Sequence, residues 1–381
     1  MPKNGARHAD LLGIKVSLES AATAGTDRNH TVGSEDFMDN HPPSNQPSAK
    51  LAISVNPMAG RDVRRLAARA TNMTHEAKRD LVARIAAGAD AAGVTDIYVA
   101  REPFQIASLA LQHMPLTARV HIIDIPLTNT ARDTEVALHQ FRALGCETVV
   151  SLGGDGTNRA LVRARQDYDL LPISTGTNNV FPELVEPTIV GIVAGFNARG
   201  VLAHSSATPP LKRRAKVLHL ETPFGRDIAL IDAVQIRDDH VGNLLPFDEA
   251  RLQRLALTRA EPDAIGMSPI GGYFDPVYAG DDVGLLVDID SRGQLVNTPL
   301  SPGLFKPVGV AGTERMAFEK PVTWVGPGVI ALDGDRDHQL KAGETARLTL
   351  RRDGPYLIDI DRAMRWLAAA GMMNTVNAEI G

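Results

Sequence analysis

The feature that most constrains the fold of this chain is a regular alternation of short apolar runs with helical stretches, which begins at Lys50. The runs that we expect to form strands cover residues 51–56, 96–100, 119–125, 147–152 and 170–174. Helical spacing lies between them, over residues 74–92, 104–113, 130–144 and 157–166. Strands that are apolar on both faces and alternate with helices are typical of a parallel sheet covered by helices.

The pattern changes after about residue 206, where strand-like runs are separated by Gly, Pro and Asp turns. Two details are expected within this region: a helix over about 248–260 and a hairpin turn at DSRG, residues 290–293. The stretch IDRAMRWLAAAGM predicts an amphipathic helix that ends near Gly371. We therefore predict an α/β fold class, with a parallel-sheet domain followed by a mainly β second domain and a C-terminal helix.

The first 48 residues are polar and scattered with Asn, His, Ser, Asp and Pro, which predicts a flexible N-terminal leader. An extended arm that packs on a partner subunit is the alternative. The expected domains that follow are an α/β domain over 49–206, a mainly β domain over 207–356 and a C-terminal helix within 357–381.

Charge and cysteine content bear on the class of function. The formal net charge of −5 provides no overall basic field for nucleic acid or for an anionic membrane. The single cysteine, Cys146, excludes an internal disulfide and fits a reducing cytosol. The eleven histidines form no zinc-binding spacing, and no apolar run approaches 18 residues. We expect a cytoplasmic protein that binds neither nucleic acid nor membrane.

Three loops directly follow predicted strands, and in a parallel sheet such loops gather at the edge where ligands bind. The most specific is LGGDGTN, in which Gly153, Gly154 and Gly156 lack a Cβ atom, so that backbone N–H groups can approach a phosphate closely. Thr157 is suited to cap the next helix or to contact a phosphate. The glycine spacing matches neither the Walker P-loop nor the Rossmann fingerprint, so hydride transfer loses its main support.

Asp155 places a carboxylate inside this glycine-rich loop. A carboxylate among phosphates is repelled unless a cation lies between them or the carboxylate acts on a proton. Two functional interpretations follow. Asp155 either holds Mg²⁺ together with a nucleotide, or it accepts the proton of an attacking hydroxyl. A turn closed by the aspartate side chain is the structural alternative.

The other two loops are polar. NPMAGR ends a strand with Asn56 and places Gly60 and Arg61 where a helix N-terminus would attract an anion. The loop STGTNN collects hydroxyl and amide groups that suit a nucleotide phosphate, ribose or adenine. Its candidate binding residues are Thr175, Gly176, Thr177, Asn178 and Asn179. Each of these two loops alone is a weak signal, because a plain turn or a polar connector explains it equally well.

Together the three loops resemble the signatures of the superfamily that contains NAD kinases, diacylglycerol kinases and sphingosine kinases. GGDGT resembles the shared signature, NPMAG the NPxSG-type loop of the lipid kinases, and STGTNNVFP their GTGNDFA loop. The whole pattern is most similar to the acetoin catabolism protein X branch, which is ATP-NAD kinase-like. The resemblance runs from about Leu51 to Gly371 and includes DPVYAGDDVGLLVDI and ALDGDRDH in the second domain.

The resemblance implies that the first domain binds ATP with Mg²⁺, that a β-sandwich domain holds the acceptor, and that the C-terminal helix returns to the first domain. The three loops would contact the nucleotide. Asp155 would match the essential aspartate that activates the ribose 2′-hydroxyl in NAD kinases. The implied reaction transfers the γ-phosphate to a hydroxyl of NAD(H) or a related small metabolite, in NADP biosynthesis or acetoin catabolism. Related kinases form homodimers or tetramers, so we expect a homo-oligomer.

The sequence departs from NAD kinases where they grip the dinucleotide with an Asn-Glu pair, because Ile231 and Asp232 stand there. An isoleucine side chain donates no hydrogen bond, so a small polyol or hydroxyketone is a further acceptor option. Asp232 and Asp335 are the candidate acceptor-binding residues, Asp335 matching the acid of a DGE-like stretch. An exposed turn is the alternative for Asp335. At Asp281 and Asp282 a turn is expected, with metal binding as the alternative.

Two other classes of function stay open. A nucleotide-binding regulatory protein that has lost catalysis would explain the departure at Ile231. A lipid kinase would fit the NPMAG and GTNN loops, but it would need a deep apolar channel in the second domain. The sequence identifies no direct metal ligand.

Overall fold

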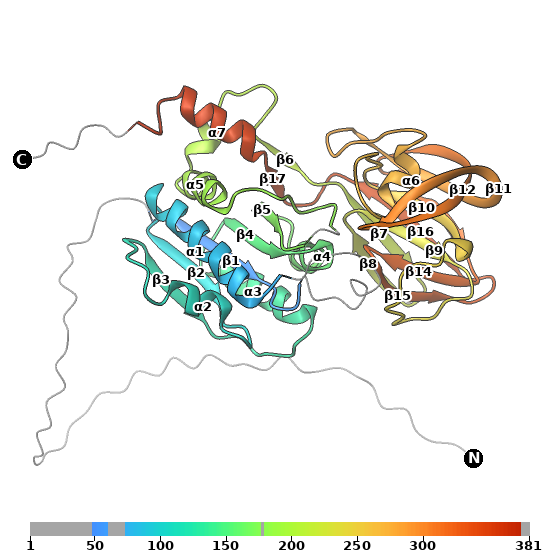
Figure 1. The fold of residues 1–381 in the computed structure, drawn as a ribbon, viewed down its shortest axis with the longest axis horizontal. Coiled ribbons are helices and arrows are strands. Elements are labelled where there is room, and N and C mark those ends of the chain that lie inside the picture. The colour runs from blue at the N-terminus through green and yellow to red at the C-terminus, as the bar shows by residue number, and fades with distance from the viewer. Residues whose placement is uncertain (1–47, 60–72, 177–178, 375–381) are drawn as a thin grey trace, which may run out of the picture. The chain divides into compact units, whose positions relative to one another are not determined.

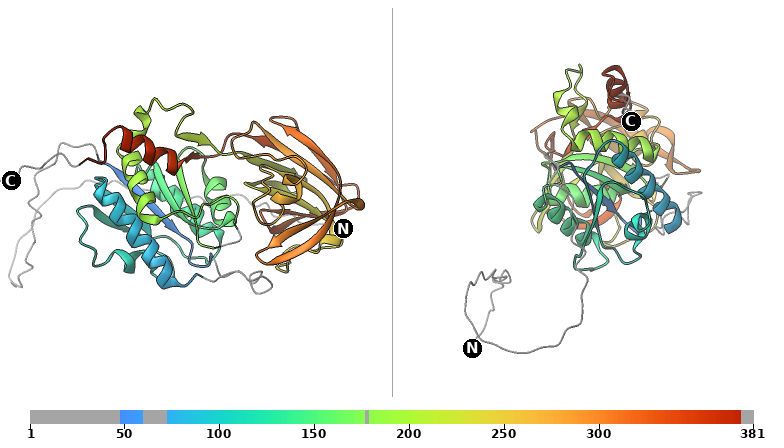
Figure 2. Two further views of the ribbon diagram at one scale, coloured as in Figure 1. Left: turned by 45° about the horizontal axis from the view of Figure 1, so that its top comes forward. Right: turned by 90° about the vertical axis from the view of Figure 1, so that its left-hand side faces the viewer.

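The computed structural model describes residues 48–59, 73–176 and 179–374, which are coloured in Figures 1 and 2. The predicted N-terminal leader lies outside the described residues, as do four predicted site residues: Gly60, Arg61, Thr177 and Asn178. The described residues belong to one compact unit. None of the helices in this part of the chain is both long and apolar enough to cross a membrane.

The α/β region is built on a seven-stranded sheet. Its strands are β1 (Lys50–Val55), β2 (Asp96–Ala100), β3 (Arg119–Ile123), β4 (Thr148–Gly153), β5 (Asp169–Ser174), β6 (Lys212–Arg214) and β17 (Tyr356–Ile358). The order is β3-β2-β1-β4-β5-β17-β6, and every neighbouring pair is parallel except β17 with β6. The predicted parallel sheet is therefore confirmed. β6 and β17 join it from chain segments that flank the β-rich region, and the domain boundaries themselves stay a prediction.

Helices cover both faces of this sheet (Figure 1). They are α1 (His75–Ala91), α2 (Ile106–Leu111), α3 (Ala131–Ala143), α4 (Asp155–Ala164), α5 (Pro187–Ala198) and α7 (Ile360–Ala369). One core contains Ile85, Val190 and Leu367, from α1, α5 and α7, so the C-terminal helix packs on the first sheet as predicted. The other core contains Leu138 and Leu161, from α3 and α4.

Glycine allows α1 and α5 to cross closely. A Cβ atom on Gly88 of α1 would collide with the backbone carbonyl of Thr188, and a Cβ atom on Gly191 of α5 would collide with that of Ile85. Neither position therefore accepts a larger side chain without moving a backbone.

The β-rich region is a sandwich, whose strands lie in two layers (Figure 2). Its strands are β7 (Val217–Thr222), β8 (Gly225–Ala229), β9 (Asp232–Ile236), β10 (Leu252–Leu257), β11 (Val283–Ser301), β12 (Leu304–Ala317), β13 (Val322–Val325), β14 (Gly328–Leu332), β15 (Asp335–Leu340) and β16 (Thr345–Arg351). One sheet has the order β12-β11-β10-β9-β14-β15 and the other β13-β16-β7-β8. The core between them contains Leu220 and Leu348 from the smaller sheet and Ala256 and Ile330 from the larger. The predicted mainly β second domain is confirmed.

Two local predictions for this region are wrong. Residues 248–260 form no helix beyond the short 3-10 turn η3 (Glu249–Arg251), because β10 follows at once and pairs with both β9 and β11. The stretch 290–293 is no hairpin turn but a bulge inside β11, where Ile289 and Gln294 both oppose Val310. A bulge requires the same polar and glycine residues as a turn, so the sequence does not distinguish the two.

Candidate functional site

The glycine-rich loop joins the end of β4 to the first residue of α4, Asp155. A Cβ atom on Gly153 would lie 2.5 Å from the Thr157 side chain, and one on Gly154 would lie 2.6 Å from Oδ1 of Asn179. A side chain at either position would therefore displace Thr157 or Asn179. Nδ2 of Asn56 donates a hydrogen bond to Oγ1 of Thr157 at 2.8 Å, which joins the first predicted loop to the second.

The first loop is held by a side chain that the sequence did not single out. Lys78 of α1 is completely buried, and its Nζ donates hydrogen bonds to the carbonyl oxygens of Asn56 at 3.1 Å and Pro57 at 2.6 Å. Nothing in the helical pattern of residues 74–92 marks this lysine as different from its neighbours. It shapes the strand end from which Asn56 reaches the glycine-rich loop.

The third loop is tied to itself and to the glycine-rich loop. Nδ2 of Asn179 donates to Oγ of Ser174 at 2.8 Å, and that hydroxyl donates to the Gly176 carbonyl at 2.5 Å. Oγ1 of Thr175 is buried and has no hydrogen-bond partner among the described residues. The described residues of all three loops are thus brought together at the carboxyl ends of β1, β4 and β5.

Asp155 is partly buried and is bound by backbone N–H groups of the third loop. The N–H of Phe181 donates to Oδ1 at 2.8 Å, and the N–H of Val180 lies 3.1 Å from Oδ1 and 3.2 Å from Oδ2. Oδ2 receives only the longer, shared contact, which leaves this oxygen with lone pairs for a substrate.

A second carboxylate, Asp333, is held in the same manner in the turn between β14 and β15. It accepts hydrogen bonds from the N–H groups of Leu230 at 2.8 Å, Ile231 at 2.8 Å and Asp232 at 3.2 Å. Its backbone has a φ of +47°, which an aspartate tolerates better than most residues. In the sequence, Asp333 belongs to the ALDGDRDH stretch, which carries part of the family resemblance.

The two carboxylates influence each other. Burial raises the pKa of Asp155 to about 7, and the negative charge of Asp333 adds to this rise, whereas the two N–H groups and the Arg259 guanidinium oppose it. Burial also raises the pKa of Asp333, whereas Arg159 and the backbone N–H groups oppose that rise. A carboxyl with a pKa of about 7 beside a second carboxyl whose pKa is also raised is typical of sites that transfer protons.

Two arginines that the sequence did not single out support this pair. Arg159 of α4 is 4% exposed and donates to the Leu332 carbonyl at 2.6 Å and to Asp335 at 2.9 Å. Arg259 follows β10 and donates to the Val180 carbonyl at 3.2 Å. The position of Arg159, one helical turn after Asp155, is the only sequence signal that either arginine offered.

The predicted acceptor residues lie beside this pair. Asp232 is 8% exposed, and its carbonyl accepts a hydrogen bond from the N–H of Asp333 at 3.0 Å. Asp335 forms an ion pair with Arg159 instead of standing alone in an exposed turn. The side chain of Ile231 is buried in the core shared with α3 and α4. The acceptor-binding roles of Asp232 and Asp335 stay predictions.

Asp281 and Asp282 form a turn, as predicted. Asp281 accepts a hydrogen bond from the N–H of Tyr278 at 2.8 Å, and Asp282 pairs with Arg352 at 2.9 Å. Within the described ranges, no group of three or more His, Cys, Asp or Glu side chains is arranged to hold a metal ion.

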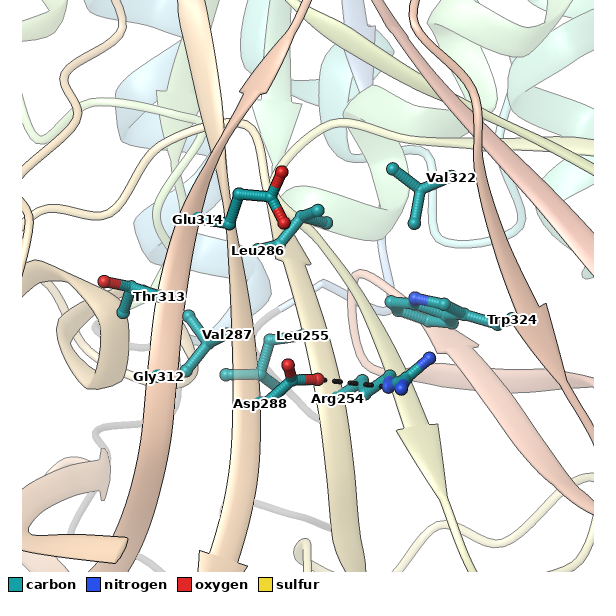
Figure 3. Close-up of a pocket in the computed structure, with 10 residues that line it drawn as sticks. All are labelled: Arg254, Leu255, Leu286, Val287, Asp288, Gly312, Thr313, Glu314, Val322 and Trp324. Carbon is teal, nitrogen blue, oxygen red and sulfur yellow. Dashed lines mark ion pairs between the residues drawn. The ribbon is translucent and has the colours of Figure 1, made fainter.

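A pocket of about 310 Å³ lies elsewhere in the β-rich region (Figure 3). Leu255, Leu286 and Trp324 contribute apolar surface to it, and Arg254 and Asp288 form an ion pair in its wall at 3.1 Å. It contains none of the residues predicted from the three loops. Its charged wall also differs from the apolar channel that the acyl chains of a lipid would need.

Comparison with known proteins defines the class. Residues 51–210 match the family model of the ATP-NAD kinase N-terminal domain, and residues 216–353 match that of the acetoin catabolism protein X C-terminal domain. The chain is therefore an NAD kinase-like protein, as its loops predicted. Acetoin catabolism protein X of Cupriavidus necator is 30% identical to it over 338 residues, which cover 86% of this chain and 94% of that protein. The chain belongs to the acetoin catabolism protein X family.

Solved structures with a similar fold are more distant. Yeast NADH kinase, in complex with NADH, is 15% identical with a TM-score of 0.46, and the match covers 88% of this chain and 93% of the other. A diacylglycerol kinase from Bacillus anthracis is 14% identical with a TM-score of 0.39, and that match covers 81% of this chain and 96% of the other. These likenesses are too remote to bear on the activity.

Proposed function

We propose that this protein is an ATP-dependent kinase that transfers the γ-phosphate to a hydroxyl of NAD(H) or a related small metabolite. The observation that carries the proposal is the Asp155 carboxylate, which lies at the start of α4, close to a second acid, with a pKa of about 7. Such a carboxylate is partly ionised at neutral pH and is suited to accept the proton of the attacking hydroxyl. The ATP-NAD kinase match of residues 51–210 supports the nucleotide part of the proposal.

ATP would lie against the glycine-rich loop, where the first N–H groups of α4 and the absence of Cβ atoms favour a phosphate. The nucleotide-binding residues that we propose are Asn56, Gly60, Arg61, Gly153, Gly154, Gly156, Thr157, Thr175, Gly176, Thr177, Asn178 and Asn179. Mg²⁺ would come with ATP and neutralise charge on its phosphates, which together with water supply most ligands of this ion in kinases. No residue of this chain is assigned as its ligand.

The acceptor would meet the opposite side of Asp155, near Asp232 and Asp335. Ile231 offers a hydroxylated ligand nothing from its buried side chain, and its N–H is already bound to Asp333. This observation favours an acceptor that needs fewer polar contacts than a dinucleotide. It is also the observation behind the second candidate function, a nucleotide-binding regulatory protein without catalysis. Cytoplasmic location and homo-oligomerisation stay predictions.

The decisive experiment measures ATP consumption by the purified protein with Mg²⁺ over NAD, NADH, acetoin, small polyols and diacylglycerol, and identifies products by mass spectrometry. We expect a phosphorylated product with one hydroxylated metabolite and none with the Asp155→Asn variant. Calorimetric binding of ATP without turnover of any acceptor would support the regulatory function. Absence of nucleotide binding would contradict both functions.

A further inference from the structure

We propose that Arg259 is a positioning residue for Asp155, acting through the peptide group that joins Val180 to Phe181. The inference rests on the proposed function in one respect: it takes Asp155 to be the proton acceptor of the kinase reaction. The contact between these residues is a property of the fold, and it is testable without any assay of turnover.

The geometry is a chain of two hydrogen bonds through one peptide group. Nη1 of Arg259 donates to the carbonyl oxygen of Val180 at 3.2 Å, and the N–H of the same peptide group, which belongs to Phe181, donates to Oδ1 of Asp155 at 2.8 Å. The peptide is trans, so its C=O and N–H point in opposite directions. The guanidinium therefore lies at the negative end of the peptide dipole and the carboxylate at the positive end.

A cation at the carbonyl polarises the peptide group and strengthens the hydrogen bond that its N–H makes. The guanidinium also lies over the ring of the buried Phe181, with Cζ 5.6 Å from the ring centroid. Arg259 thus holds this residue by its carbonyl and by its side chain, which fixes the direction of the N–H toward Asp155.

The backbone of Arg259 is itself fixed. Its carbonyl accepts a hydrogen bond from Oγ of Ser268 at 2.9 Å. The preceding residue, Thr258, donates from Oγ1 to the Leu230 carbonyl at 2.6 Å and from its N–H to the Ile231 carbonyl at 2.8 Å. The N–H groups of those two peptides belong to Ile231 and Asp232, and both donate to Asp333.

Thr258 and Arg259, the two residues after β10, therefore support the two acids in the same way. Each donates to the carbonyl of a peptide group whose N–H binds an acid. Thr258 supports Asp333 with neutral donors, and Arg259 supports Asp155 with a cation. The charged groups that act on Asp155 are Asp333, from the turn between β14 and β15, and Arg259. Arg159, on the helix that Asp155 begins, acts on Asp333. Arg259 is thus the cation that stabilises the ionised form of Asp155.

The first test is the pH dependence of kcat/KM in the Arg259→Gln variant, once the acceptor is known. We expect the acidic limb to move to higher pH by roughly 0.5 to 1 unit, because the anion of Asp155 loses a stabilising cation. Activity at pH 7 should fall about twofold to fivefold and recover in part at higher pH, and Arg259→Lys should lie between the two proteins. The matched control is Arg254→Gln in β10, because the side chain of Arg254 is 48% exposed and pairs with Asp288 at 3.1 Å, away from both acids.

An equal loss of activity at every pH, with the acidic limb unmoved, would overturn the proposal, because a purely structural role has that effect. The second test needs no substrate. The amide signal of Phe181 in two-dimensional NMR spectra of the full chain should shift with pH as Asp155 ionises, and this shift should vanish in Asp155→Asn. In Arg259→Gln its midpoint should rise by the same roughly 0.5 to 1 unit.

An unchanged midpoint in Arg259→Gln, or a Phe181 amide insensitive to pH in the unaltered protein, would overturn the proposal whatever the activity. Conversely, a shifted midpoint in a protein that phosphorylates nothing would leave the Arg259–Asp155 connection standing and remove the proposed kinase function. Thermal unfolding of both variants checks that each is folded before its titration is compared.

Discussion

The two acids of the site are held alike but supported differently. Asp155, in the α/β region, takes the N–H groups of two consecutive residues, and Asp333, in the sandwich, takes those of three. One of the two peptide groups that bind Asp155 is contacted at its carbonyl by the cation of Arg259, whereas two of the three that bind Asp333 are contacted by the uncharged Thr258. Asp155 also keeps an oxygen that receives only one long hydrogen bond. The difference supports the proposed role of Asp155 as the reacting acid, with Asp333 as the acid that raises its pKa.

The largest expected effect comes from replacing Asp155, the acid of the pair that we propose to react. Asp155→Asn should lower kcat by about 10² to 10⁴, because an amide does not accept the proton of the attacking hydroxyl. Asp333→Asn should cost less than about tenfold at pH 7 and should move the acidic limb of the pH profile to lower pH, since its charge raises the pKa of Asp155. Steady-state kinetics over pH 5–9 would check both, and equal losses of kcat in the two variants would contradict the division of roles.

A second expected effect compares a buried arginine of α4, Arg159, with an exposed one, Arg163. Arg159→Met should lower the free energy of unfolding by about 2 to 3 kcal/mol, because the Leu332 carbonyl loses its donor and Asp333 loses a cation that favours its ionised form. Arg163→Met, one turn further along α4, is the control: its side chain is 35% exposed and pairs with Glu135 and Asp227, so its loss should cost less than about 1 kcal/mol. Urea denaturation measures both. Equal destabilisation would show that burial of Arg159 adds nothing.

A third prediction concerns the pH dependence of stability. The pKa of Asp155 is raised in the folded protein, so the folded state binds a proton more tightly than the unfolded state, and stability falls as the pH rises from about 4 to about 7. Asp155→Asn removes this loss. The variant should therefore be more stable than the unaltered protein by about 3 to 4 kcal/mol above pH 7, with the difference disappearing near pH 4. Thermal melts at several pH values measure it, and a variant less stable at pH 8 would contradict the assigned shift.

How much of the site could be predicted depends on which contacts are local. The strand ends and their glycine-rich loops were predictable because a buried parallel strand is apolar throughout and its loop follows at once, which places Asn56, Gly153 and Asn179 at one edge. The cradles of Asp155 and Asp333 were not predictable, because their donors are backbone N–H groups. Such groups occur at almost every residue, so no sequence pattern distinguishes these from the others. Arg259 is not recognisable from the sequence for a related reason: the pattern favours a helix over residues 248–260, and a helix would direct that side chain differently.

The smallest expected effect tests whether the positive charge of Arg259 matters, or only a hydrogen bond to the peptide group that binds the acid. Thr258→Val keeps the shape of the side chain and removes the hydrogen bond to the Leu230 carbonyl, so the free energy of unfolding should fall by about 1 kcal/mol. The acidic limb of the pH profile should stay in place, because the lost donor is uncharged and does not change the electrostatic field at Asp155. Thr188→Val should change neither quantity, because Thr188 is a partly exposed residue of α5 whose hydroxyl donates to the exposed Glu186. If Thr258→Val moved the acidic limb as far as Arg259→Gln does, the cation would have no special part, and the two cradles would be equivalent.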